Sequence, residues 1–281
     1  MRPWTLRACF AIWLLALVAG ACGHPSPRAP SGSARRIVSL APSITELLFA
    51  LGAGDQVVGR TTYCKYPPAA LTVPSVGDGL NPSVEAIIAR HPDLVVLYRS
   101  PQTEAAARQL EAFGVRALMV RHDRLEDIAE TAQLLGEATG HTAAGTAIAR
   151  TIDSALGAPP PPDLGARLAY VVWDNPPIVI GGGSYLDQLS GLAGATNAFH
   201  DLATPSATVS LETIAVRDPD WIAVLREADD TAPPAYAARP EWRVVRAVRE
   251  HRFLLLPAEL FGQPSARASE AIVWLRRQLT R

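Results

Sequence analysis

The order of apolar and polar residues predicts short buried strands that alternate with amphipathic helices. IVSL, starting at Ile37, and DLVVLY, starting at Asp93, are apolar enough for strands buried on both faces, as parallel sheets require. Between them, TELLFALGAG places Leu47, Leu48 and Leu51 on one helical face and ends at glycines, which favour a helix C-terminus. This alternation is typical of an α/β fold.

One phrase of this pattern occurs twice. It reads SVEAIIARHPDLVV at residues 83–96 and SLETIAVRDPDWIA at residues 210–223. In each copy the serine can cap a helix, the glutamate two residues later lies in the first helical turn, and a buried strand follows a proline. The repeat predicts two structurally similar halves, since a solenoid needs at least three stacked units.

A long stretch without proline separates the two copies. Residues 125–157 are compatible with one linking helix, which the run of prolines that follows would end. The sequence therefore predicts two similar Rossmann-like α/β lobes, residues 35–124 and 158–281, joined by one long helix. A ligand cleft is expected between the lobes, because large pockets favour domain interfaces.

The N-terminal residues predict export. Residues 1–21 carry arginines, a short apolar core and small residues, as signal peptides do. LVAGAC resembles a lipobox and predicts lipidation of Cys22; cleavage near Ala21 without a lipid is the alternative. Residues 22–34, rich in proline, serine and glycine, form a flexible tether in this interpretation. Cys64 then remains as a single thiol in an oxidising compartment, most simply a buried apolar side chain.

Composition argues against several functions. The net charge of −1 offers no basic stripe for nucleic acid. The histidines are scattered without a His-x-x-x-His pair, and no Gly-x-Ser-x-Gly elbow occurs. We therefore expect no protein-bound metal, no resident cofactor and no enzymatic activity.

Several motifs, in order, resemble the periplasmic substrate-binding proteins with a helical backbone, which supply ABC importers with cobalamin, haem or iron–siderophore complexes. The similarity covers residues 35–281 and is greatest to the cobalamin-binding members. The motifs are SLAPSITELLFALG, TTYCKYPPAA, LNPSVEAIIARHPDLVV, NPPIVIGGGS, ATNAFHD and VSLETIAVRDPDWI. The resemblance implies an extracytoplasmic receptor, a monomer held at the membrane only by its lipid anchor, that captures a corrinoid and delivers it to a permease dimer.

The resemblance also implies a set of ligand-binding residues on loops after the strands. Tyr63 matches a tyrosine that contacts the corrin, and Tyr98 stands at the position of a tryptophan. Flat rings suit a flat macrocycle, although a single aromatic residue is more often part of a core. The full set is Tyr63, Asp78, Tyr98, Trp173, Phe261 and Gln263. Asp78 and Gln263 replace an aromatic residue and part of a charged pair of the family.

Glu85 and Glu212 match the glutamates that, in the family, dock each lobe onto one permease subunit. Without the resemblance, each would be interpreted as a solvated glutamate that favours the helix dipole. Two alternatives for the whole protein stay open. One is a receptor for haem or an iron–siderophore complex, and the other is an exported metal-handling protein or enzyme built on the same bilobed frame.

Overall fold

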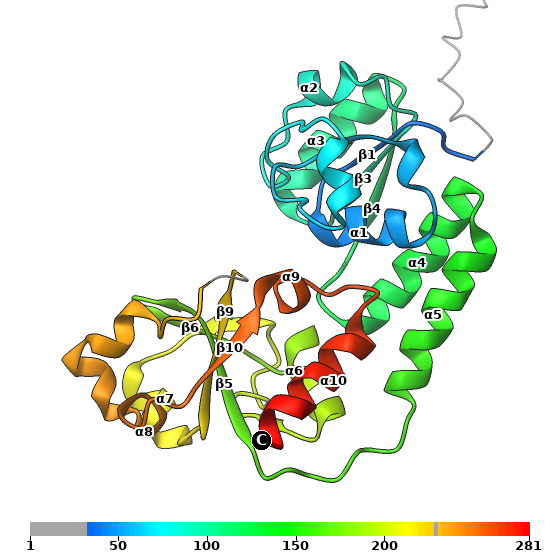
Figure 1. Ribbon diagram of the computed structural model, residues 1–281. Coiled ribbons are helices and arrows are strands. Elements are labelled where there is room, and N and C mark those ends of the chain that lie inside the picture. The colour runs from blue at the N-terminus through cyan, green and yellow to red at the C-terminus, as the bar shows by residue number, and fades with distance from the viewer. Residues whose placement is uncertain (1–32, 228–229) are drawn as a thin grey trace, which may run out of the picture.

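The protein consists of two α/β lobes connected on one side by a pair of helices (Figure 1). The computed structural model describes residues 33–227 and 230–281. The predicted signal peptide, the lipidation site Cys22 and all but the last two residues of the tether lie outside the described residues. Within the described ranges, no helix is long and apolar enough to span a bilayer.

Lobe one is built on a parallel four-stranded sheet in the order β2-β1-β3-β4. Its central strands β1 and β3 are fully or almost fully buried, as the apolar run of β3 predicts, and β1 also buries the polar residue Ser39. The elements are β1 (Ile37–Ser39), α1 (Pro42–Ala50), η1 (Gly54–Gln56), β2 (Val57–Arg60), η2 (Pro68–Thr72), α2 (Val84–Ile88), β3 (Leu94–Tyr98), α3 (Pro101–Ala112) and β4 (Arg116–Val120).

Lobe two has a mixed sheet in the order β10-β9-β5-β6-β8, with the short strand β7 paired to β5. β10, β9 and β5 are parallel, whereas β6 returns antiparallel to β5 and β8 pairs antiparallel to β6. The elements are β5 (Arg167–Asp174), β6 (Pro177–Ile180), α6 (Tyr185–Ala193), β7 (Thr196–Asn197), β8 (Ser206–Thr208), α7 (Leu211–Arg217), β9 (Trp221–Arg226), η3 (Ala235–Ala238), η4 (Pro240–Val244), α8 (Arg246–Arg249), β10 (Phe253–Pro257), α9 (Ala258–Phe261) and α10 (Ala268–Leu279). The two lobes are therefore similar in layout but not copies.

The repeated phrase forms the same unit in both lobes, as predicted. The Ser83 hydroxyl accepts a hydrogen bond from the backbone N–H of Ala86 at 3.2 Å, and Ser210 caps α7 in the same way through Thr213, also at 3.2 Å. Each helix is followed by a largely buried strand, β3 or β9, that lies between two parallel neighbours in its sheet. The phrase is thus a capped helix, a turn and a core strand, used once per lobe.

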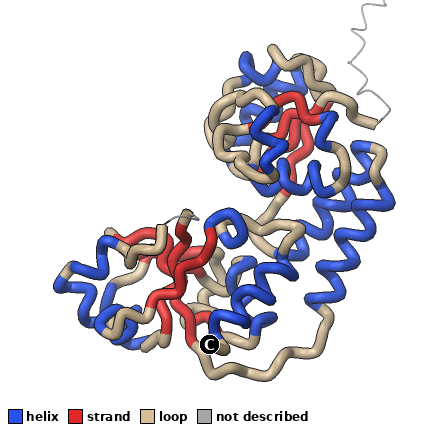
Figure 2. The backbone as a smooth tube through the Cα atoms, viewed as in Figure 1, coloured by secondary structure: helices blue, strands red, loops and turns tan. Residues whose placement is uncertain are grey.

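The single long linking helix predicted for residues 125–157 is wrong in one respect: two helices occupy these residues. α4 spans Leu125–Thr139 and α5 spans Thr142–Leu156, and they lie side by side in Figures 1 and 2. Gly140 ends α4 with φ at 82°, a left-handed conformation that glycine adopts without steric cost. The chain therefore reverses there, and the connection is a helical hairpin.

Two glycines let the hairpin helices approach closely. A Cβ on Gly145 would lie 2.4 Å from the carbonyl oxygen of Ala132 and 3.2 Å from the Cα of Gly136. One apolar core runs from lobe one through this hairpin into lobe two and includes Leu47, Leu135 and Leu189. The connection is consequently a packed part of the fold.

Gly145→Ala should lower the free energy of unfolding by about 1–3 kcal/mol, because the new methyl group overlaps backbone atoms. Gly191→Ala is the matched control, since Gly191 also lies in a helix but a methyl group added there would have no atom within 4 Å. That substitution should stabilise the protein by about 0.5–1 kcal/mol. Urea unfolding of both variants measures the two changes, and equal effects would contradict the close helix packing.

Candidate ligand-binding cleft

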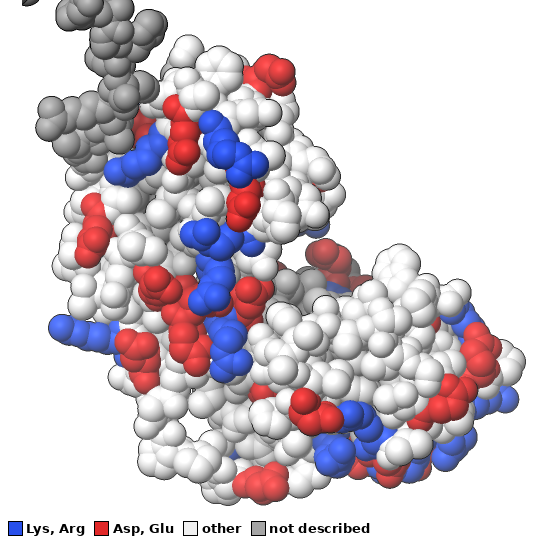
Figure 3. All heavy atoms as spheres, turned by 180° about the vertical axis from the view of Figure 1, so that it is seen from behind, with Lys and Arg blue, Asp and Glu red and all other residues white. Residues whose placement is uncertain are grey.

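A cavity of about 240 Å³ lies between the lobes and is lined from both sides. It is bordered where β1 ends in lobe one and where β9 and β10 end in lobe two, and crevices at the carboxyl ends of strands are the usual ligand sites of α/β sheets. Figure 3 shows the molecule hollowed between the lobes, with acidic and basic side chains intermixed on that face. The lining residues are Pro42, Tyr63, Lys65, Tyr66, Glu227, Ala258, Glu259, Gly262 and Gln263.

A buried ion pair joins the lobes beside this cavity. Glu46 of α1 is 3% exposed, and its carboxylate accepts from Nε of Arg267 at 2.9 Å and from Nη2 at 3.3 Å. The guanidinium also lies over the ring of Tyr66, 3.8 Å from its centroid. Gln263, one of the predicted ligand residues, lies within 3.5 Å of the same carboxylate. The charges of Glu46 and Arg267 therefore neutralise each other beside the cavity.

Of the two tyrosines of lobe one predicted to bind the ligand, Tyr98 does not belong to the lining of this cavity. Tyr63 lines the cavity and is 65% exposed. Tyr98 ends β3, donates a 2.9 Å hydrogen bond from its hydroxyl to Asp123, and stacks on His122 with ring centroids 4.4 Å apart. Burial, together with the Asp123 carboxylate, raises the pKa of Tyr98 to about 12. Tyr98 is therefore a neutral, fixed ring.

His122 and Asp123, which hold Tyr98, were not among the residues predicted from the sequence. Nδ1 of His122 lies 2.6 Å from the Ser43 hydroxyl at the start of α1. Burial lowers the pKa of His122, so the imidazole is neutral at physiological pH. They are the second and third residues after β4, at the same sheet edge as Tyr98. Their position after a strand was the one signal that could have identified them.

Asp78 lies in a tight turn close to the end of β1. Its carboxylate accepts a 2.8 Å hydrogen bond from the backbone N–H of Leu80, and the side chain of Leu80 is 63% exposed. A Cβ on Gly79 would lie 2.1 Å from the carbonyl oxygen of Leu40. The turn is thus pressed against the chain that leaves β1, so it borders the carboxyl end of the sheet.

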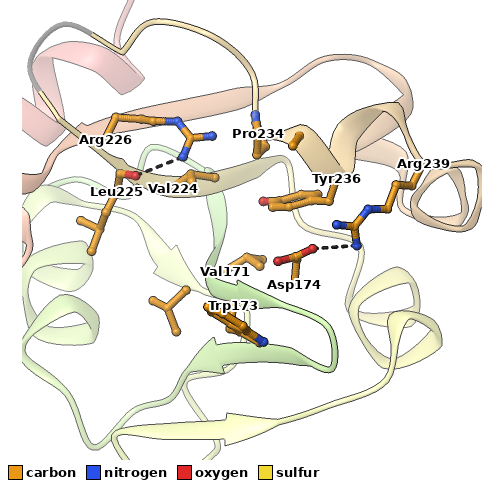
Figure 4. A pocket seen from close by; sticks show the side chains of 11 residues that line it. Val171, Trp173, Asp174, Val224, Leu225, Arg226, Pro234, Tyr236 and Arg239 are labelled. Carbon is orange, nitrogen blue, oxygen red and sulfur yellow. Dashed lines mark hydrogen bonds and ion pairs between the residues drawn. The ribbon is translucent and has the colours of Figure 1, made fainter.

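Trp173 lies at the carboxyl end of β5 in lobe two, beside a second cavity of about 270 Å³ (Figure 4). Its ring is 58% exposed, and its indole N–H donates to the carbonyl oxygen of Asn175 at 2.9 Å. Phe261 has no such exposure: it is 0% exposed and packs edge-on against Trp274, with centroids 5.2 Å apart. The structure therefore places Phe261 in the core, because α9 turns its ring inward.

Glu85 and Glu212 lie in the first turns of α2 and α7 and are both exposed. In Figure 1, α2 is at the top of the upper lobe and α7 at the lower left of the other, both far from α9, whose residues Ala258 and Glu259 line the cavity. A hydrogen bond from the Ser210 hydroxyl lowers the pKa of Glu212, which keeps it ionised. The two carboxylates thus occupy corresponding places on the two lobes.

Two other sequence features have structural explanations. Cys64 is buried; its sulfur accepts a hydrogen bond from the hydroxyl group of Thr45 and is hydrogen-bonded to the hydroxyl group of Thr61 at 3.1 Å. The Gly181–Gly183 segment packs on its own chain: a Cβ on Gly182 would lie 2.0 Å from the carbonyl oxygen of His200. Within residues 33–227 and 230–281, no three His, Cys, Asp or Glu side chains are grouped closely enough to hold a metal ion.

The sequence matches the family model described as periplasmic binding protein over residues 37–260. The chain belongs to the periplasmic binding protein family. This match includes almost all of lobe one, the helical hairpin and most of lobe two. Proteins of this family bind solutes and are not enzymes, so this member is a binding protein.

Individual periplasmic binding proteins agree with the family assignment. The vitamin B12-binding protein of Salmonella typhimurium is 31% identical over 201 residues, which are 70% of this chain and 75% of the relative. The structure of the vitamin B12-binding protein of Vibrio cholerae has a TM-score of 0.69 at 26% identity and covers 88% of this chain and 97% of its own. The structure of a periplasmic heme-binding protein, BhuT, in complex with two hemes has a TM-score of 0.72 at 25% identity and covers 89% of this chain and 98% of its own.

Proposed function

We propose that this protein captures a corrinoid, cobalamin in the first place, in the cleft between its lobes and delivers it to an ABC import permease. The observation that carries the proposal is the exposure of flat rings at the strand ends of both lobes, Tyr63 in lobe one and Trp173 in lobe two. Rings on two sides can hold a broad, flat ligand at a small cost in side-chain entropy. The B12-binding relatives support this choice of ligand.

The charge of the cleft favours a neutral ligand. Arg267 is already paired with Glu46, and Lys65 lies 3.6 Å from the carboxylate of Glu227. Tyr98 is neutral at physiological pH, and burial lowers the pKa of His122 so that it is neutral too. No uncompensated cluster of cations is found in the described lining, whereas anionic siderophores and haem propionates would be held best by one.

Haem is the second candidate. It is supported by the similarity to the heme-binding protein BhuT, and by a flat macrocycle that the same rings would contact. An exported enzyme on the same frame is a poorer proposal, because the family consists of binding proteins.

The remaining parts of the proposal concern delivery. Glu85 and Glu212 would each dock one lobe onto one permease subunit, and a single copy of the protein would serve both. Cys22, outside the described residues, would carry a lipid that holds the receptor on the outer side of the membrane. A relative named as a substrate-binding lipoprotein of an ABC transporter supports this arrangement.

Isothermal titration of the purified protein with cyanocobalamin tests the ligand. We expect one-to-one binding, and weak or no binding of hemin and of a ferric hydroxamate siderophore. Failure of every corrinoid, together with binding of hemin or a siderophore, would overturn the choice of ligand and keep the receptor class.

Tyr63→Ala combined with Trp173→Ala should weaken cyanocobalamin binding by at least about thirtyfold, the effect of removing a binding hot spot of about 2 kcal/mol. Phe113→Ala is the control, since Phe113 is 68% exposed but follows α3, at the opposite end of the sheet from the cleft. An equal loss in both variants would show that the rings do not contact the ligand.

A further inference from the structure

The cavity beside Trp173 and the cavity between the lobes both lie at the carboxyl end of β9. Arg226 lines the cavity beside Trp173, and the next residue, Glu227, lines the cavity between the lobes. Consecutive Cα atoms are about 3.8 Å apart, so the linings of the two cavities are adjacent along the chain at this point. A ligand that lies in the cleft and contacts Trp173, as proposed above, would therefore bring its side groups next to the second cavity.

Tyr236 provides an unsatisfied hydroxyl in this cavity. The residue is 6% exposed, and its ring stacks on that of Trp242 with the ring centroids 4.1 Å apart. Its hydroxyl has no hydrogen-bond partner among the described residues, and Figure 4 shows it directed into the cavity. A buried hydroxyl without a partner is costly, which makes this atom a marker for a ligand group. Burial raises the Tyr236 pKa, so the phenol remains a donor.

A carboxylate oxygen accompanies that hydroxyl. One oxygen of Asp174 pairs with Arg239 at 2.7 Å. In Figure 4 the other oxygen of Asp174 lies on the same side of the cavity as the Tyr236 hydroxyl. The guanidinium of Arg226 donates hydrogen bonds to backbone carbonyl groups and forms an ion pair with Asp230 at 3.3 Å. The cavity thus offers one donor and one acceptor between apolar walls such as Val171 and Val224, with its charges balanced.

We propose that Tyr236 and Asp174 form a subsite for a primary amide on the periphery of the transported ligand. The proposal rests on the proposed function of the cleft. The amide carbonyl would accept a hydrogen bond from Tyr236, and the amide N–H would donate to the free oxygen of Asp174. A carboxylate in the same place would be repelled by Asp174, and Arg239 would not compensate, because it is already paired with Asp174. The subsite therefore selects macrocycles that carry amide groups over those that carry acids.

Tyr236→Phe in the full chain should weaken cyanocobalamin binding about three- to tenfold, the effect of one lost hydrogen bond. Its melting temperature should stay the same or rise, because the hydroxyl that is removed had no partner in the protein. Tyr170→Phe is the matched control: the Tyr170 hydroxyl is hydrogen-bonded to Ser190 at 2.6 Å in the core. This control should lower the melting temperature and leave affinity unchanged, the opposite pattern.

Asp174→Asn tests selectivity. Cyanocobalamin would be compared with its monocarboxylic acid derivatives, each with one peripheral amide hydrolysed. At least one derivative should bind the wild-type protein about three- to tenfold more weakly than cyanocobalamin, and this preference should disappear or reverse in Asp174→Asn, where Arg239 is left free for the acid. Asp201→Asn, which also removes a carboxylate paired with an arginine in lobe two, should keep the preference.

The outcomes separate the two proposals. If the wild-type protein binds cyanocobalamin and Tyr236→Phe binds it equally well, the subsite is refuted and the cleft proposal stands. Unchanged preference in Asp174→Asn also refutes the subsite. If the wild-type protein binds no corrinoid, both proposals fail.

Discussion

Cells that depend on this receptor should lose corrinoid uptake when Glu85 and Glu212 are both changed to Lys, while the purified variant should bind its ligand as before. Both carboxylates are exposed in the first turn of a capped helix, remote from the cleft. In the proposed complex each meets a cationic recess of the permease, so a lysine would replace attraction by repulsion at both contacts. Uptake of labelled cobalamin and calorimetry measure the two properties separately.

The control for this experiment is Glu104→Lys combined with Glu270→Lys. These glutamates also lie in first helical turns, one in each lobe, in α3 and α10. The control loses the same favourable interaction with a helix dipole but should retain uptake. Each single change, Glu85→Lys or Glu212→Lys, should impair uptake partially. Normal import by the double variant would mean that the repeated phrase reflects only the common architecture of the lobes.

The repeated phrase shows why much of the fold could be predicted. Its serine caps, amphipathic helices and buried strands are local features, and the local physics is the same in both lobes. The position of two lobes around a cleft followed from the repeat and the resemblance together. The repeated unit was predictable because it depends on residues close together in the sequence.

The prediction of a single linking helix was wrong because the feature that ends α4 is local but gives only a weak signal in the sequence. Gly140 can continue a helix at a modest cost or reverse the chain, and the sequence of residues 125–157 contains four glycines without a proline to decide between the two. Close packing of Gly145 against α4 decides it in favour of the hairpin. The antiparallel return of β6 in lobe two follows from its two-residue connection to β5, residues 175–176, because parallel strands need a much longer crossover.

The site was harder to predict than the fold, because its important contacts join distant residues. Glu46 and Arg267 are 221 positions apart, and Glu46 stands in an apolar helix where a charge has no local partner. A charged residue within an apolar helix was visible in the sequence, and it indicates a buried ion pair with a distant residue. Ring exposure was not visible: Tyr63 and Phe261 both follow strands, but only Tyr63 is exposed, since the inward face of the short helix α9 holds Phe261.

Arg267→Ala should lower the free energy of unfolding by about 3–5 kcal/mol, the usual cost of leaving a buried charge without its partner. Glu46 is 3% exposed, so water cannot replace the lost guanidinium, and the stacking on Tyr66 is lost as well. Arg243→Ala, at an exposed arginine of η4, is the control and should change stability within about 0.5 kcal/mol. Urea unfolding followed by circular dichroism measures both variants.

A double substitution, Glu46→Leu with Arg267→Leu, distinguishes the two causes of that loss. Apolar side chains of suitable size often replace a buried ion pair at little or no cost, so the double variant should recover most of the stability lost in Arg267→Ala. Such recovery would show that the unpaired carboxylate causes the loss. If the double variant is instead as unstable as the single one, the pair itself holds α1 to the segment before α10, and the lobes depend on it for their mutual position. If Arg267→Ala is no less stable than Arg243→Ala, the ion pair contributes nothing to the fold.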